Sequence, residues 1–156
     1  IYHATVEVAK NIKSDIKLGE VLELSVLEKI IKPVFPYAFK VEGLCSEYDL
    51  WIPELNDGVE VKFDLMAEKT DNLFFESEHN GKPSGINITE SGLWIQFDGT
   101  WLFFFTPDKI KQMIKDNNII EQIYRFDIND NRVTKGYLVD KEICEKYAHE
   151  LKEYVI

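Results

Sequence analysis

The chain has few of the residues that build disulfide frameworks or zinc sites. Its 156 residues include only two cysteines, Cys45 and Cys144, and three histidines. The cysteines form no motif, so we expect reduced thiols of an intracellular protein. The histidines, at positions 3, 79 and 149, do not have the spacing of a zinc site. We therefore expect neither a disulfide scaffold nor a structural zinc centre.

Long apolar runs and low-complexity tracts are also missing. No run approaches the ~20 residues of a membrane-spanning helix, and no signal peptide is apparent. We expect no membrane partner and a cytoplasmic location. No internal repeat or linker is visible, and hydrophobic residues make up 45% of the sequence. The sequence therefore predicts a single domain over residues 1–156 with a sizeable core.

Basic residues are scarce relative to acidic ones. Lysine and arginine total 18 against 28 aspartates and glutamates, which gives a net charge of −10. Because phosphate backbones attract positive charge, an acidic nucleic-acid-binding protein must concentrate its lysines locally or bridge to phosphate through a metal. The same balance is compatible with a protein that mimics DNA. The acidic residues are interspersed with lysines, however, which is typical of an ordinary solvated surface.

Apolar periodicity and turn residues predict an α/β (α+β) fold with a central mixed β-sheet flanked by helices. The helices are expected over residues 16–32, 107–117 and 140–154. The strands are expected over 37–45, 49–52, 59–65, 72–77, 93–97, 101–106, 119–127 and 132–139. We expect the turn between the second and third strands at Pro53 and Asn56-Asp57-Gly58. The aromatic residues of 94–105 are expected in the core.

Charged residues occupy one face of the third predicted strand. Glu60 and Lys62 alternate with apolar residues, so their side chains point to the same side. Asp49 begins the preceding strand. Two carboxylates beside an amine can hold a hard divalent cation and orient a water molecule. That is the minimum equipment for metal-assisted hydrolysis of a phosphodiester bond.

A helical acid completes the predicted pocket. Glu20 shares a helical row with Leu24, Leu27 and Ile31, which favours an inward-facing carboxylate. Asp49, then Glu60-Val61-Lys62, with Glu20 upstream, resembles the pattern of the PD-(D/E)XK nuclease superfamily. Tyr48 stands where many members have proline.

The resemblance covers residues 15–106 and implies a restriction-endonuclease-like fold. It implies that Asp49 and Glu60 ligate Mg²⁺ or Mn²⁺, with the Val61 carbonyl as a further ligand. Glu20 would complete the pocket or bind a second ion. Lys62 would orient or help deprotonate the attacking water and offset charge on the phosphorus.

A second block follows the strand that ends near Glu76. The sequence Lys82-Pro83-Ser84-Gly85 resembles an element of phage-type and Holliday-junction-resolvase-like members, although Asp71 stands where glycine is expected upstream. A glycine-containing turn exposes backbone amides to anions, so Lys82 and Ser84 are candidate phosphate contacts. Glu76 is a candidate carboxylate near the metal edge. The resemblance also implies a phage-encoded protein that acts in a host cytoplasm, and a homodimer.

The expected function is therefore a metal-dependent endonuclease acting on DNA rather than RNA. Three alternatives stay open: an acidic DNA mimic, a catalytically inactive binding protein with a nuclease fold, and an RNA endonuclease. For the nuclease, we expect a local positive rim around the metal cleft. Lys62 and Lys82 are its main expected contributors, with Lys40 and Lys69 as further ones.

Overall fold

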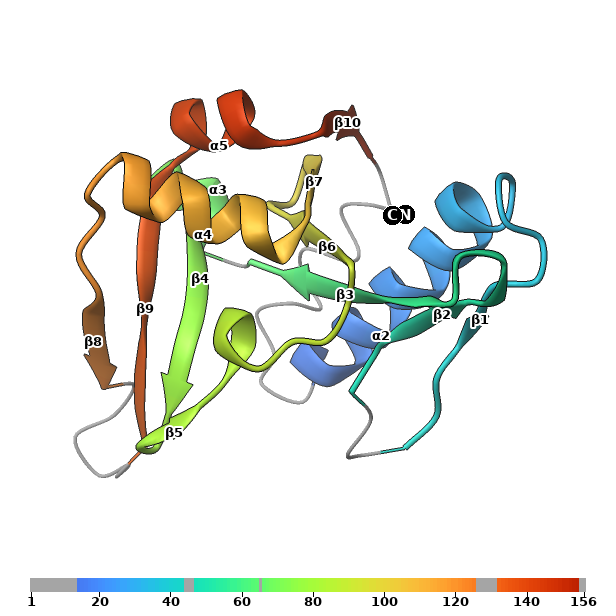
Figure 1. The fold of residues 1–156 in the computed structure, drawn as a ribbon, viewed down its shortest axis with the longest axis horizontal. Coiled ribbons are helices and arrows are strands. Elements are labelled where there is room, and N and C mark those ends of the chain that lie inside the picture. Colours follow the sequence, from blue (N-terminus) through green and yellow to red (C-terminus); the bar gives the residue numbers. More distant parts are fainter. Residues whose placement is uncertain (1–13, 44–46, 65, 126–131, 155–156) are drawn as a thin grey trace.

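Two β-sheets and several helices make up the protein (Figure 1). The structure is a computed structural model, and it describes residues 14–43, 47–64, 66–125 and 132–154. Cys45 lies outside these ranges. The mixed α/β fold class predicted from the sequence is confirmed.

The larger sheet has six strands. In spatial order they are β1 (Phe39–Lys40), β2 (Leu50–Ile52), β3 (Asp57–Phe63), β6 (Leu93–Phe97), β7 (Trp101–Phe105) and β10 (Glu150–Glu153). Neighbouring strands are antiparallel except for β3 and β6, which run parallel with Val59 opposite Leu93. A parallel pair needs a long crossover connection. Here the crossover carries part of the second sheet.

The smaller sheet has four antiparallel strands. Their order is β5 (Lys82–Pro83), β4 (Asn72–His79), β9 (Val133–Asp140) and β8 (Gln122–Arg125). A register shift interrupts the β4–β9 pairing between Glu76 and Glu78. Gly136 on β9 leaves room for an aromatic ring, because a Cβ there would lie 2.3 Å from Cζ of Phe74.

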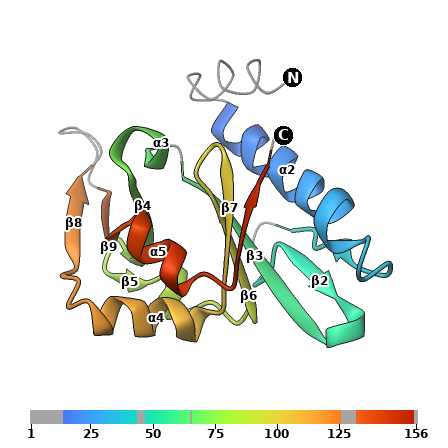
Figure 2. The same ribbon diagram turned by 90° about the horizontal axis from the view of Figure 1, so that it is seen from above.

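The helices cover both faces of the larger sheet (Figure 2). They are α2 (Ser14–Val26), which continues as the π-helical turn η1 (Leu27–Ile31), then η2 (Pro53–Leu55), α3 (Ala67–Thr70), η3 (Gly85–Asn87), α4 (Pro107–Asp116) and α5 (Lys141–Tyr147). At the start of α4 the Thr106 hydroxyl accepts the Lys109 N–H at 3.2 Å, and Pro107 occupies the first turn. Within the described ranges, no helix combines the length and apolar character needed to cross a bilayer.

Two apolar cores lie on opposite faces of the six-stranded sheet. Successive residues of β6 alternate between them: Trp94 joins one core and Ile95 the other. The first core packs α2 and η1 on the sheet. The second holds α4, α5 and the four-stranded sheet against the other face (Figure 2). The predicted aromatic core is confirmed at Trp94, Phe103, Phe104 and Phe105, while Trp101 is exposed.

Three predicted boundaries were wrong. The helix expected over 140–154 ends at Tyr147, because Ala148 takes an extended conformation and the His149 N–H donates to Phe104 O at 2.7 Å, where β10 begins to pair with β7. The strand expected over 37–45 is reduced to Phe39–Lys40 within the described residues. The turn before β3 falls at 53–56, with Asn56 in the left-handed region, and β3 already begins at Asp57.

Candidate active site

An open edge of β3 creates the site. Strand β2 pairs only with residues 57–59 of β3. Beyond that point, the Val61 N–H donates to Asp49 Oδ2 at 2.7 Å instead of to a neighbouring strand. The Asp49 backbone is fixed as well, because its N–H donates to Val59 O at 3.0 Å. The Asp49 carboxylate is therefore held beside the centre of β3.

Glu60 and Lys62 lie on the same face of β3, as the period-two pattern predicted. Lys62 Nζ is 2.9 Å from Glu60 Oε1, and the exposed fractions of their side chains are 43% and 17%. The same ammonium lies 5.7 Å from the centroid of the Trp94 ring, in cation–π range. The lysine is thus held between a carboxylate and an aromatic face.

Glu23, and not Glu20, is the helix carboxylate at this site. Glu20 is exposed, so the expectation that it faces inward was wrong. The row used to predict it is itself interrupted, because Leu24 is 47% exposed. The i+3 and i+4 neighbours of Glu23, Val26 and Leu27, are both buried. That spacing was the available sequence signal for Glu23.

The three carboxyl groups of the site hold their protons more tightly than usual. Burial and the nearby Asp49 charge raise the pKa of Glu23 to about 7, although Lys40, 3.7 Å away, opposes the shift. Burial also raises the pKa of Asp49 and of Glu60, against the opposing charge of Lys62. The Asp49 charge raises the pKa of Glu23, as expected when two acids lie close enough to compete for one proton.

Lys62 is a protonated cation in this environment. Burial by itself lowers the pKa of Lys62, but the charges of Glu60 and Asp49 outweigh that effect, and the net shift is upward. The lysine therefore acts through its charge and its N–H donors.

The donor set suits a hard divalent cation by its chemistry. Glu23, Asp49 and Glu60 offer carboxylate oxygens, and their raised pKa values mean that a cation would replace a proton or an ammonium. In the structure, Glu60 forms an ion pair with Lys62. Across the described ranges, no three acidic, histidine or cysteine side chains are already grouped to hold a metal ion. Metal binding at this site would have to compete with the existing ion pair.

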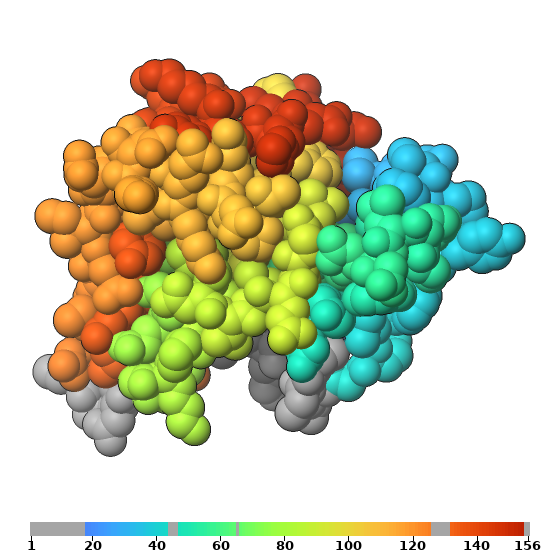
Figure 3. All heavy atoms as spheres, viewed as in Figure 1, coloured from blue at the N-terminus to red at the C-terminus, as the bar shows by residue number. Residues whose placement is uncertain are grey.

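A cavity of about 510 Å³ connects the site to the second predicted block. Glu60, Lys62 and Glu76 line it together with Ser84 and Gly85. The Ser84 hydroxyl is buried without a hydrogen-bond partner among the described residues. The Ser84 N–H, in contrast, donates a hydrogen bond to Ser77 O at 3.0 Å. Figure 3 shows the β4–β5 end of the smaller sheet (light green) and the part that carries β2 on the same face of the molecule.

The positive rim expected around the cleft is not present in this cavity. Glu47, Glu60, Glu76 and Glu90 line it, with Lys62 as the single cation. Lys82 is exposed on β5. It lines neither this cavity nor a second, smaller cavity that Lys62 also lines. Lys40 is engaged by Glu23.

A buried polar network next to the site was not predicted from the sequence. Asp64 follows β3 and accepts hydrogen bonds from the Phe74 N–H at 2.7 Å and from Gln96 Nε2 at 3.1 Å. Gln96 Oε1 in turn accepts the Trp94 indole N–H at 2.9 Å. The network links β3, β4 and β6. A period-two continuation from Glu60 and Lys62 to Asp64 was the only sequence signal for it.

Comparison of the chain with protein-family models, with curated proteins and with solved structures gives no match.

Proposed function

We propose that the protein is a divalent-metal-dependent nuclease that hydrolyses phosphodiester bonds in DNA. The observation that carries the proposal is the convergence of Glu23, Asp49, Glu60 and Lys62 from a helix and two strands. Three carboxyl groups of raised pKa near one half-exposed ammonium form a cluster of the kind that is typical of functional sites.

The side chains divide into cation ligands and a charge donor. Asp49 and Glu60, with the Val61 carbonyl, would hold Mg²⁺ or Mn²⁺, and Glu23 takes the place proposed for Glu20. When bound, the metal lowers the pKa of a coordinated water and stabilises charge on a phosphate. Lys62 contributes as an ammonium. It would attract the negative charge that builds up on phosphorus, from a position fixed beside Glu60 and the Trp94 ring.

The acidic character of the cleft is compatible with this function only with metal present. One ammonium against four carboxylates repels a phosphate backbone. A divalent cation changes that balance and bridges the chain to its substrate. We therefore expect DNA binding itself, and not only cleavage, to require the metal.

The same lining favours a second candidate, an acidic DNA mimic that binds another protein. Glu47, Glu76 and Glu90 supply negative charge that catalysis does not need. A mimic would require no metal and would not depend on Lys62.

Cleavage of supercoiled plasmid and of branched DNA in Mn²⁺, Mg²⁺ or EDTA tests the proposal. We expect cleavage in Mn²⁺ and Mg²⁺, none in EDTA, and none with Asp49→Ala under any condition. The matched control is Asp108→Ala, which removes an exposed carboxylate from α4, away from the cavity at the site. If Asp49→Ala cleaves as fast as the parent protein, the site is wrong. If the parent protein cleaves neither DNA nor RNA, the mimic is favoured.

A further inference from the structure

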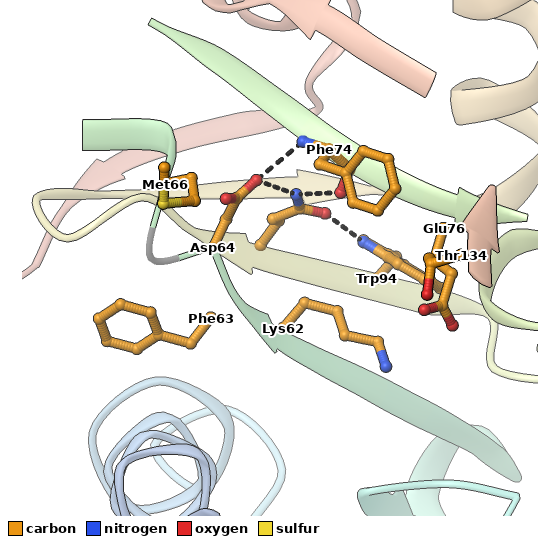
Figure 4. Close-up of a pocket in the computed structure, with 9 residues that line it drawn as sticks. Lys62, Phe63, Asp64, Met66, Phe74, Glu76, Trp94 and Thr134 are labelled. Atoms are coloured by element: carbon orange, nitrogen blue, oxygen red, sulfur yellow. Dashed lines mark hydrogen bonds between the residues drawn. The ribbon is translucent and has the colours of Figure 1, made fainter. Parts of the chain in front are cut away.

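A second cavity opens on the other side of Lys62. It has a volume of about 290 Å³, and we call it the aromatic cavity. Its lining residues are Lys62, Phe63, Asp64, Met66, Phe74, Glu76, Trp94, Gln96 and Thr134. Phe63 and Met66 lie at one end, and Glu76 and Thr134 at the other, with the Lys62 ammonium pointing towards the latter (Figure 4).

Most polar groups of the aromatic cavity already satisfy one another. Asp64, Gln96 and Trp94 form the hydrogen-bond network described above. Thr134 Oγ1 lies 2.9 Å from His79 Nδ1. These groups fix the shape of the cavity and leave little capacity for a ligand.

Glu76 is the exception. The Glu76 carboxylate has no hydrogen-bond or ion-pair partner among the residues that the structure describes. Its charge acts on Lys62 only at a distance, by raising the pKa of the lysine. Glu76 and Phe74 are two residues apart on β4 and both line the aromatic cavity. Because an ionised carboxylate only accepts hydrogen bonds, a ligand here must bring N–H or O–H donors.

The aromatic side chains that line the cavity and the volume of the cavity determine the shape and size of the ligand. The half-buried Phe63 and Phe74 present aromatic surface, which favours a flat molecule, and the buried Trp94 closes the wall behind Lys62. A volume of about 290 Å³ is at the lower end of small-molecule sites, which start near ~300 Å³. The aromatic cavity therefore has room for one ring system and not for a stacked pair.

We propose that the aromatic cavity binds one unstacked nucleobase of the substrate, guanine in preference to the others. Guanine presents two adjacent N–H donors on its Watson–Crick edge, and the two oxygens of the Glu76 carboxylate accept both. Lys62 lines both cavities, so the base enters beside the phosphate that Lys62 contacts. This inference rests on the proposed nuclease function and adds that the nucleotide beside the cut is unpaired.

Binding of short single-stranded oligonucleotides in Ca²⁺ tests the inference by fluorescence anisotropy. One is all thymidine, and the other carries one central guanine. We expect the guanine oligonucleotide to bind on the order of tenfold more tightly, as bidentate base recognition does. Glu76→Gln should remove this preference. The matched control is Glu78→Gln on the same strand, because Glu78 is paired with Lys135 at 3.0 Å and does not line the cavity. It should keep the preference.

A change in the ligand avoids any doubt about folding of the variants. Inosine in place of the central guanine removes one of the two donors, and we expect the parent protein to lose most of the preference. Equal affinity for guanine, inosine and thymidine oligonucleotides overturns the inference. A preference that survives Glu76→Gln also overturns it.

The outcomes separate this inference from the proposed function. Cleavage in Mn²⁺ without any base preference overturns the base site and leaves the nuclease standing. A guanine preference that depends on Glu76, in a protein that cleaves neither DNA nor RNA, supports the base site and overturns the nuclease.

Discussion

At the scale of single residues, Glu20 and Glu23 differ in environment although they lie one helical turn apart. Glu20 faces solvent, while Glu23 is near Asp49 and holds its proton up to a pH of about 7. The sequence predicted an acid from this helix but not which one, because the row of Leu24, Leu27 and Ile31 indicated Glu20, whereas the buried Val26 and Leu27 indicate Glu23. Glu60 and Lys62 were predictable as neighbours, since period-two alternation on a strand fixes which side chains share a face. Asp49 precedes β2 and was expected beside them from the motif, not from alternation.

Glu23 should make the stability of the metal-free protein depend on pH. Its pKa is raised on folding from 4.5 to about 7, so the folded state binds more protons than the unfolded state between these values. The stabilisation is fully present below pH 4.5 and is lost as the pH rises through 7. Glu23→Gln does not titrate. The melting temperature of Glu23→Gln in EDTA, relative to that of the parent protein, should therefore increase as the pH rises from 5 to 8.

The control for this prediction is Glu20→Gln. Glu20 is exposed, so its variant should stay parallel to the parent protein over the whole pH range. If both variants follow the parent curve, Glu23 does not share a proton with Asp49 in the folded protein.

Asp49 and Glu60 should be needed for metal binding. Asp49→Ala or Glu60→Ala removes a hard oxygen ligand that no neighbour replaces, so calorimetry should detect no Mn²⁺ binding. Circular dichroism should report an unchanged fold. Unaltered Mn²⁺ affinity in either variant would exclude that residue as a ligand.

Lys62 should affect chemistry more than metal binding. Lys62→Ala removes the ammonium that lies 2.9 Å from Glu60, so the carboxylate becomes available and Mn²⁺ affinity should be equal or higher. The rate at saturating Mn²⁺ should fall by a factor on the order of 10² to 10³, as expected when one preorganised donor is lost. Single-turnover kinetics separates these effects. A parent-like rate would mean that Lys62 is an ordinary strand residue.

At the scale of the elements, local sequence signals predicted the inner strands and failed at the sheet edges. Alternation and the Asp98-Gly99 turn gave β6 and β7, and Pro107 gave the start of α4. The pairing of β10 with β7 depends on residues distant in sequence, so a local pattern over 140–154 indicated a helix instead. The open edge of β3 likewise depends on where β2 begins, because Leu50 is the first residue of β2 and pairs with Val59, and the sequence does not reveal this boundary.

Asp64 should be important for stability because it joins three strands. Asp64→Ala leaves the Phe74 N–H and Gln96 Nε2 without their acceptor in a buried network. We expect the free energy of unfolding to fall by about 3 kcal/mol, the upper part of the range for unpaired buried groups. Urea denaturation measures it. Asp108→Ala, exposed on α4, should change it by less than about 0.5 kcal/mol. Equal midpoints for the two variants would contradict the role of the network.

At the scale of the whole molecule, the candidate site shares the acidic character of the chain, whose net charge is −10, because four glutamates and one lysine line its cavity. Few phosphates can then be contacted directly by lysine. We expect the logarithm of DNA affinity, measured in Ca²⁺, to fall with the logarithm of salt concentration with a slope no steeper than about −3, which corresponds to roughly three phosphate contacts. A slope steeper than about −6 would require a basic surface that the site does not provide.

Anomalous scattering from a crystal of the protein soaked in Mn²⁺ tests the central claim most directly. The claim predicts a manganese peak in contact with the Asp49 and Glu60 carboxylates, with Glu23 adjacent and the Lys62 ammonium displaced from Glu60. The Asp49→Ala crystal should lack the peak. A fully soaked parent crystal with no peak at these carboxylates, or with manganese only at surface acids such as Glu47 and Glu90, would contradict the account.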